Sequence, residues 1–119
     1  MHEHLAVGVG RCFPGEYLRE VCDLEALATL EAAVSQGFKW FDVAPLSGYG
    51  LVEERLGQFL RQSDMPRPSI ATKVGWPLRP RGSQQNHRHF IAPLQYRSAF
   101  DYNAGGIERS YEESLQPWC

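Results

Sequence analysis

The sequence of 119 residues has little that points to a nucleic-acid-binding, membrane or secreted protein. Its formal net charge is −2, and the nearest approach to a basic cluster, Arg79, Arg81 and Arg88, is spread along a loop. It has no apolar run long enough to span a bilayer, and residues 1–5 lack the regions of a signal peptide. Its three cysteines are an odd number, which argues against a disulfide framework. We therefore expect a cytoplasmic globular protein that binds neither nucleic acid nor membrane.

The sequence does have a regular alternation of strand and helix patterns. Short apolar runs predict three strands, over residues 5–12, 38–43 and 69–74. Apolar residues at helical spacing predict three helices, over residues 23–36, 52–62 and 104–116. This order is typical of parallel βαβ units and indicates an α/β fold. A closed barrel of such units needs about 250 residues, so these three units are expected to form part of a barrel and not a closed one.

Residues with special backbone preferences mark the ends of these helices. Asp23 is a plausible N-cap of the first helix, and Gly37 stands where a C′ glycine would end it. Pro117 is expected to stop the third helix. Residues 75–103, which precede that helix, are rich in Pro, Gly, Gln, Arg and His and predict a long irregular loop.

The apolar stripes predict which faces of the second and third helices are buried. In the second helix the stripe consists of Leu56, Phe59 and Leu60. The charged residues Glu-Glu-Arg at positions 53–55 are therefore predicted to lie on the solvent-exposed face. In the third helix the predicted stripe is Ile107, Tyr111, Ser114 and Leu115.

Asp42 and Lys73 stand near the carboxyl ends of the second and third predicted strands. In βα folds these strand ends form the active face, and neighbouring parallel strands lie about 4.8 Å apart. The two side chains could therefore meet as an ion pair, because a charge beside apolar strand residues is costly unless it is paired. The spacing alone supports a structural salt bridge and a functional pair equally.

Longer stretches resemble a known family. Residues 41–60, Phe-Asp-Val-Ala-Pro-Leu-Ser-Gly-Tyr-Gly-Leu-Val-Glu-Glu-Arg-Leu-Gly-Gln-Phe-Leu, resemble the aldo/keto reductase signature around its catalytic Asp and Tyr. Residues 71–75, Ala-Thr-Lys-Val-Gly, resemble the lysine motif of that family. Three other stretches resemble its subgroup of D-threo-aldose/L-fucose 1-dehydrogenases and pyridoxal 4-dehydrogenases, at residues 17–21, 100–103 and 108–115. The resemblance runs in one register over residues 5–116.

The resemblance implies a fold and an activity. The fold is the eight-stranded (β/α)8 TIM barrel, of which residues 1–119 would be the N-terminal third. The activity is hydride transfer between a nicotinamide cofactor, NADP or NAD, and a small carbonyl or sugar. The family uses an Asp, a Tyr, a Lys and a His: the Tyr donates a proton, the Lys lowers the pKa of the Tyr, the Asp holds the Lys and the His orients the carbonyl. Asp42 and Lys73 match the Asp and the Lys.

The sequence also departs from this pattern. The position of the catalytic Tyr is occupied by Ser47, and Tyr49 could replace it only if the loop shifts by two residues, up to ~7 Å of chain. In the family the His follows a fourth strand, and the last two βα units bind the pyrophosphate and adenosine. The resemblance implies that residues 1–119 provide only the part of the cofactor site around the nicotinamide, near Gly10, Arg11, Cys12 and Asp42. We therefore expect the chain to be inactive alone.

Other interpretations remain open. The histidines form two His-x-His pairs, which we expect to be solvated and not to bind a metal: His2, His4, His87 and His89. The chain could be a non-catalytic partner that associates through exposed strand edges. Its last residues, Pro-Trp-Cys, could instead indicate a truncated or frameshifted reading frame with no independent function.

Overall fold

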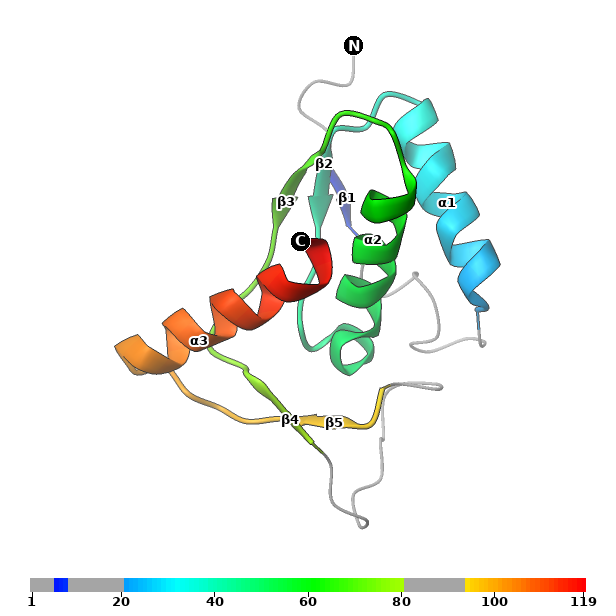
Figure 1. Cartoon of the computed structure of the whole chain (residues 1–119). Coiled ribbons are helices and arrows are strands. Elements are labelled where there is room, and N and C mark those ends of the chain that lie inside the picture. Colours follow the sequence, from blue (N-terminus) through cyan, green and yellow to red (C-terminus); the bar gives the residue numbers. More distant parts are fainter. Residues whose placement is uncertain (1–5, 9–20, 81–93) are drawn as a thin grey trace.

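The computed structural model describes residues 6–8, 21–80 and 94–119 (Figure 1). The strands are β1 (Ala6–Gly8), β2 (Trp40–Asp42), β3 (Ser69–Ala71), β4 (Leu78–Pro80) and β5 (Tyr96–Ser98). The α-helices are α1 (Asp23–Ser35), α2 (Leu51–Gln62) and α3 (Ala104–Leu115), and two short 3-10 helices are η1 (Ser47–Gly50) and η2 (Gln116–Trp118). Strands β2 and β3 are shorter than the sequence patterns predicted.

The first three strands form one parallel sheet in the order β1-β2-β3. Ala6, Val7 and Gly8 pair with Trp40, Phe41 and Asp42, which pair in turn with Ser69, Ile70 and Ala71. Helices α1 and α2 make the crossovers between these strands, as in βαβ units. The predicted α/β fold of three βα units without a closed sheet is confirmed.

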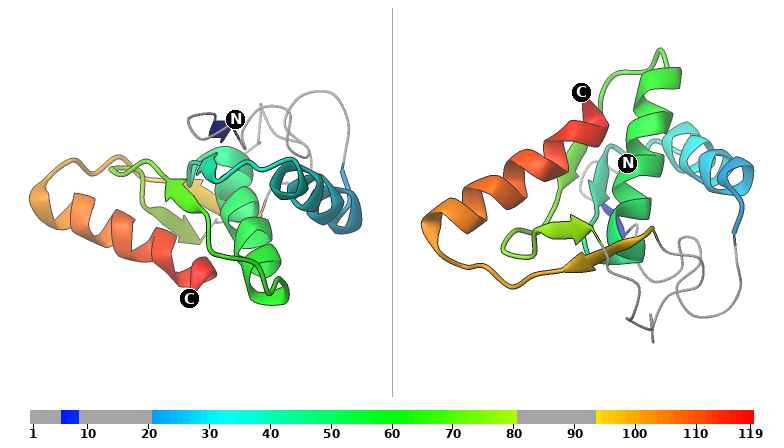
Figure 2. Two further views of the ribbon diagram at one scale, coloured as in Figure 1. Left: turned by 90° about the horizontal axis from the view of Figure 1, so that it is seen from above. Right: turned by 60° about the horizontal axis from the view of Figure 1, so that its bottom comes forward.

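The two faces of this sheet have different environments. Phe41 and Val43 are each 1% exposed and face the helices, which lie on one side of the sheet (Figures 1 and 2). The opposite face, called here the open face, carries residues that are exposed in the described part of the chain: Ala6, Gly8, Trp40, Asp42, Ser69, Ala71 and Lys73. Because side chains alternate along a strand, the open face holds small and polar residues with one large aromatic side chain.

Helix α2 lies at the centre of the core. The core cluster consists of Leu30, Phe41, Val43, Val52, Leu56, Phe59, Leu60 and Trp118. Gly57 allows η2 to approach α2 closely, because a Cβ at this position would lie 1.8 Å from the carbonyl oxygen of Pro117. The C-terminal segment therefore packs directly on α2.

The predicted solvent exposure of residues 53–55 on α2 is wrong for two of the three residues. Glu53 is 3% exposed and Arg55 is 7% exposed, whereas Glu54 is exposed as expected. Elements cover α2 on both sides, with α1 against one and η2 against the other. The buried guanidinium of Arg55 donates from Nε to Asp23 Oδ1 at 2.7 Å and from Nη2 to the carbonyl oxygen of Val21 at 2.9 Å.

The predicted stripe of α3 is also wrong in part. Ile107 and Tyr111 are 37% and 51% exposed, and Leu115 is half-buried. Ser114 is buried as predicted, and α3 buries two further small residues at a spacing of four, Gly106 and Ser110. Small side chains let the segment around Gly75 approach the helix, where the Gly75 amide donates to Ser110 Oγ at 3.2 Å.

The predictions of helix ends differ in outcome. Cys22, not Asp23, is the N-cap residue of α1, and Asp23 is the acidic first residue of its first turn. Gly37 follows α1 with a φ of +89° and donates to the carbonyl oxygen of Val34, so the predicted C′ glycine is confirmed. Helix α3 ends at Leu115, just before Pro117, so the predicted end of the third helix is confirmed, and Pro117 itself is tolerated in the first turn of η2. Trp118 follows it into the core.

The loop predicted over residues 75–103 contains a hairpin. Strands β4 and β5 pair antiparallel, with Leu78 opposite Ser98, and residues 81–93 between them lie outside the described residues. The amide of Leu94 donates to the carbonyl oxygen of Gly48 in η1, and that of Asp101 to Gly75. The second view in Figure 2 shows this hairpin beside α3 and the first turn of α2.

Candidate functional site

Asp42 and Lys73 meet on the open face of the sheet. Asp42 is the last residue of β2 and pairs in register with Ala71, the last residue of β3. Lys73 lies two residues beyond Ala71, so its side chain points to the same face. Lys73 Nζ donates to Asp42 Oδ1 at 2.9 Å and to the carbonyl oxygen of Val43 at 3.0 Å. The predicted ion pair is present.

The pair is more exposed than the sequence argument assumed. The side chains of Lys73 and Asp42 are 57% and 50% exposed, so neither charge needs a partner to offset burial. An exposed ion pair contributes about 0–1 kcal/mol to stability. An ammonium has three N–H donors, and the two contacts with Asp42 and Val43 fix its position on the open face. The pair therefore contributes little to the stability of the fold.

Ser47 and Tyr49 lie on η1, the turn that joins β2 to α2. Tyr49 has a φ of +51° and stands between Gly48 and Gly50, whose φ values are +62° and +97°. A non-glycine residue in the left-handed region is uncommon, so the strain of this turn falls on Tyr49, while the two glycines adopt positive φ without steric cost. Both candidate proton donors thus follow the carboxyl end of β2, as Asp42 does.

The expected nicotinamide contacts stay predictions. Gly10, Arg11 and Cys12 lie outside the described residues. Asp42 is described, and Gly8 pairs with it in register at the end of β1. A Cβ at Gly8 would meet nothing within 4 Å among the described residues. The open face beside Asp42 is therefore not filled by the chain that the structure describes.

The described helix N-termini do not fit the pyrophosphate of a dinucleotide. A helix N-terminus attracts phosphate through free backbone N–H groups. The first turns of α1 and α2 carry carboxylates, Asp23 with Glu25 and Glu53 with Glu54. At α3 the side chain of Asn103 already accepts from the amide of Gly106. None of these three described helix N-termini therefore fits the pyrophosphate.

Neither a metal site nor a membrane span is found where the structure can be described. The described residues contain no group of three or more His, Cys, Asp or Glu side chains that could hold a metal ion. His2, His4, His87 and His89 lie outside this part of the chain. Among the described helices none is long and apolar enough to cross a membrane.

A buried carboxylate that the sequence analysis misplaced supports the segment before Lys73. Glu53 accepts a 2.8 Å hydrogen bond at Oε1 from the hydroxyl of Thr72. Burial raises the pKa of Glu53, and the hydroxyls of Thr72 and Ser114 oppose this increase. Glu53 precedes Leu56 and Leu60 by three and seven residues. A carboxylate on the same stripe as these apolar residues was the available signal that it is buried.

Comparisons with known proteins agree with the arrangement of strands and helices. The family model described as the aldo/keto reductase family matches residues 5–117. The chain is 36% identical over 116 residues to D-threo-aldose 1-dehydrogenase from a Pseudomonas species, with 93% of the chain and 35% of that protein covered. It is 34% identical over 123 residues to pyridoxal 4-dehydrogenase of Microbacterium luteolum, with coverages of 93% and 35%.

A solved structure shows the same fold. The structure of a glycerol dehydrogenase from Gluconobacter oxydans matches with a TM-score of 0.67 and 24% sequence identity, and the match covers 95% of this chain and 31% of that one. The chain thus spans about a third of the length of the relatives that it matches.

Proposed function

The chain belongs to the aldo/keto reductase family, and on this premise we propose that it carries the Asp–Lys part of a hydride-transfer site. The reaction is nicotinamide-dependent, with NADP or NAD, and converts an aldose or aldehyde to its oxidised or reduced partner. The observation that supports this proposal is the hydrogen-bonded pair of Lys73 and Asp42 on the open face. The names of the relatives, an aldose dehydrogenase and a pyridoxal dehydrogenase, support a small carbonyl or sugar as the substrate.

The proposed role of Lys73 follows from its charge and position. Reduction of a carbonyl leaves negative charge on its oxygen, which requires a proton donor. An ammonium beside a hydroxyl lowers the pKa of that hydroxyl, because it stabilises the anion. Asp42 holds Lys73 by the 2.9 Å hydrogen bond and so keeps the ammonium near the carboxyl end of β2. Ser47 is a weak and short proton donor, and Tyr49 is the alternative on the same turn.

We also propose that the chain does not catalyse the reaction alone. A nicotinamide cofactor supplies or accepts the hydride, and the described helix N-termini do not fit its pyrophosphate. Gly10, Arg11, Cys12 and Asp42 remain the proposed contacts of its nicotinamide end. About two thirds of the length of each relative lies outside the matched part. We assign the remaining cofactor contacts and the histidine to that part.

The test compares the chain with a chimera. The purified chain should not turn over aldehydes or aldoses with NAD(P)(H). A chimera that continues residues 1–117 with the remaining strands of the D-threo-aldose dehydrogenase should bind the cofactor. In a chimera with Ser47→Tyr, turnover should fall at least 100-fold on Lys73→Met and on Asp42→Asn. Enzyme-like turnover by the chain alone, or an active chimera that Lys73→Met does not slow, would contradict the proposal.

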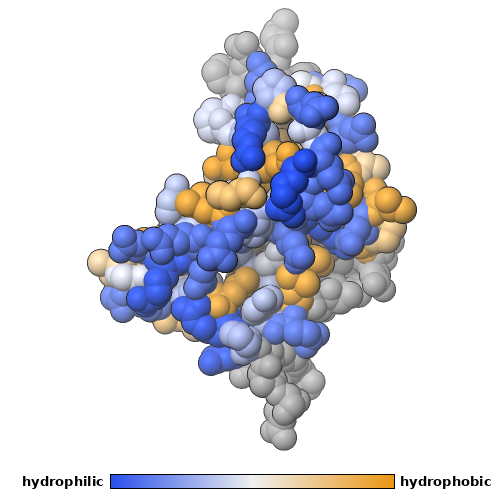
Figure 3. Space-filling model, viewed as in Figure 1, coloured by the Kyte–Doolittle hydropathy of each residue, from blue (hydrophilic) through white to orange (hydrophobic). Residues whose placement is uncertain are grey.

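A second proposal is self-association through the free edge of β3. In the described sheet β3 is an edge strand, and edge strands pair readily with other chains. A groove of about 370 Å³ runs beside this edge, lined among others by Leu60, Ile70, Val74, Tyr111 and Leu115. In the space-filling view, hydrophobic residues gather between α3 and β3 (Figure 3). A second copy of the chain would cover this apolar surface.

A further inference from the structure

Lys73 lies in a short stretch of chain that the sheet itself does not hold. Beyond the end of β3, the amide of Val43 donates to the carbonyl oxygen of Ala71 at 2.8 Å. Between described residues, Thr72, Lys73 and Val74 make no backbone-to-backbone hydrogen bond. Side-chain contacts are therefore needed to fix the backbone from which the Lys73 ammonium extends.

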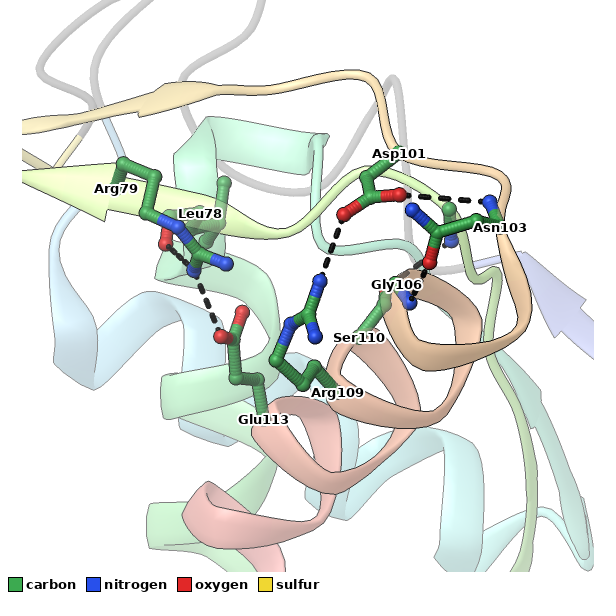
Figure 4. A network of polar contacts seen from close by, with 9 residues as sticks. Leu78, Arg79, Asp101, Asn103, Gly106, Arg109, Ser110 and Glu113 are labelled. Atoms are coloured by element: carbon green, nitrogen blue, oxygen red, sulfur yellow. Dashed lines mark hydrogen bonds and ion pairs between the residues drawn. The ribbon is translucent and has the colours of Figure 1, made fainter.

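The far end of this stretch is fixed against α3. The amide of Gly75 donates to Ser110 Oγ at 3.2 Å, and the amide of Asp101 donates to the carbonyl oxygen of Gly75 at 3.0 Å. Asp101 in turn binds Arg109 of α3 at 2.8 Å (Figure 4). Residues 72–74 thus connect a fixed strand end to a fixed helix contact.

Within this stretch, Thr72 has a polar contact with the core. Its hydroxyl donates to Oε1 of Glu53 in the first turn of α2 at 2.8 Å. Glu53 is 3% exposed, and the hydroxyl of Ser114 on α3 also stabilises its charged form. The side chain of Glu53 therefore connects α2 to the residue before Lys73.

The carboxylate of Glu53 is costly where it lies. Burial raises its pKa, which means that the surroundings disfavour the charged form. Leu56 and Leu60, which share its face of α2, are apolar and are 0% and 8% exposed. Apolar residues often replace a buried charged group without loss of stability. The fold alone therefore gives little reason for a carboxylate here, and its hydrogen bond to Thr72 indicates a local role.

We propose that Glu53 is a positioning residue for Lys73 and acts through the hydroxyl of Thr72. The hydrogen bond holds residue 72 against α2, and the alternation of side chains then directs Lys73 to Asp42 on the open face. An exposed ion pair is weak, so it cannot by itself hold a long side chain in one place. This inference rests on the proposed hydride transfer, in which Lys73 assists the proton donor.

The experiment measures by NMR how firmly Lys73 is held in the purified chain. The readouts are the order parameter of its Cε group and the nuclear Overhauser effect between its Hε protons and the Hβ protons of Asp42. We expect Thr72→Val to lower the order parameter and to reduce the Overhauser effect by at least half. Thr72→Ser, which keeps the hydroxyl, should preserve both values.

A double variant separates positioning from stability. Thr72→Val alone leaves the buried carboxylate without its donor, whereas Thr72→Val with Glu53→Met removes both polar partners. The double variant should therefore recover most of the unfolding midpoint, while Lys73 stays as loosely held as in Thr72→Val. A double variant in which Lys73 is as ordered as in the wild-type chain would show that the hydrogen bond does not position it.

The control is Phe59→Leu, which removes buried volume on the side of α2 that faces Leu27 and Glu31 of α1. This variant should lower the unfolding midpoint and leave Lys73 as ordered as in the wild-type chain. Equal loosening of Lys73 by Phe59→Leu, or no loosening by Thr72→Val, would overturn the proposal.

The chimera with Ser47→Tyr links the positioning to the reaction. There Thr72→Val should lower kcat about tenfold, because small displacements of a catalytic group slow a reaction strongly, and should leave KM within about twofold. If Lys73→Met slows this chimera and Thr72→Val does not, the positioning role of Glu53 is wrong. If Lys73→Met does not slow it, the hydride-transfer proposal is wrong, and the NMR experiment still decides whether Glu53 holds Lys73.

Discussion

The hydroxyl of Thr72 donates a 2.8 Å hydrogen bond to Oε1 of Glu53, and this bond anchors the residue just before Lys73 in the core. Successive residues of an extended segment point to opposite faces. Thr72 therefore faces the helices, while Lys73 faces Asp42 on the open face. One short segment thus holds a buried hydrogen bond on one side and presents an ammonium on the other.

This arrangement predicts that two neighbouring substitutions reduce the stability of the fold by unequal amounts. Thr72→Val should lower the free energy of unfolding by about 1–3 kcal/mol, because it leaves a buried carboxylate without its donor. Asp42→Asn should change that free energy by less than about 1 kcal/mol, because the ion pair is half exposed. Urea unfolding of the three proteins measures both values. If Asp42→Asn is the more destabilising substitution, the ion pair is structural and the hydride-transfer proposal loses its main support.

A pH dependence of stability follows from the raised pKa of Glu53. A carboxyl whose folded pKa exceeds its unfolded pKa favours the folded state most when both states are protonated. This contribution is fully present below the unfolded pKa of about 4.3 and is lost as the pH rises through the folded pKa.

Glu53→Gln should remove this dependence. Urea unfolding at several pH values between 4 and 8 should show that the stability of the wild-type chain falls relative to the variant as the pH rises. The control is Glu54→Gln, which alters the neighbouring exposed carboxylate and should keep the wild-type profile. A constant difference between wild type and Glu53→Gln across this range would show that Glu53 has an ordinary pKa.

The order of strands and helices could be predicted because the spacing of apolar residues differs between a helix and a strand that each bury one face. The sequence predicted the Asp42–Lys73 contact because the carboxyl ends of parallel strands meet at one edge. It misplaced Glu53 and Arg55 because their burial depends on hydrogen bonds to Thr72 and Asp23, which are far away in the sequence.

The remaining errors concern the buried face of α3 and the β4–β5 hairpin. The small residues of α3 are buried where larger apolar ones are exposed, since close approach of the segment at Gly75 favours small side chains. The hairpin was missed because β4 and β5, Leu-Arg-Pro and Tyr-Arg-Ser, contain no apolar run, and Pro80 argues against a strand. The strands that were predicted each belong to a short apolar run.

Gly57 should resist substitution although it lies inside a helix. Alanine normally stabilises a helix by about 1 kcal/mol over glycine. At Gly57 the new Cβ would lie 1.8 Å from the carbonyl oxygen of Pro117, so we expect a net destabilisation of about 1–3 kcal/mol. The matched control is Gly105→Ala in α3, where the nearest atom is the flexible end of Arg109 at 3.2 Å. Thermal unfolding should show a lower midpoint for the first variant and an equal or higher one for the second.

Self-association through β3 should depend on the apolar groove at its edge. Tyr111 lines this groove and is 51% exposed, so Tyr111→Glu places a charge at the contact without changing the core. Sedimentation velocity should show the wild-type chain associating at micromolar concentrations and the variant remaining monomeric. Leu24→Glu is the control, because Leu24 is 80% exposed on α1. A monomeric wild-type chain, or association unaffected by Tyr111→Glu, would exclude this surface.

The identity of the proton donor is tested in the chimera described above. If Ser47 occupies the position of the donor, Ser47→Tyr should raise kcat at least 100-fold, since a positioned general acid contributes about 10²–10⁴-fold. If Tyr49 already serves as the donor, the unaltered chimera should be active and Tyr49→Phe should abolish its activity. Tyr49 has a φ of +51° between two glycines, so the turn that carries it differs from an ordinary helical start. Activity that is high in the unaltered chimera and unaffected by both Tyr49→Phe and Ser47→Ala would show that neither residue is the donor.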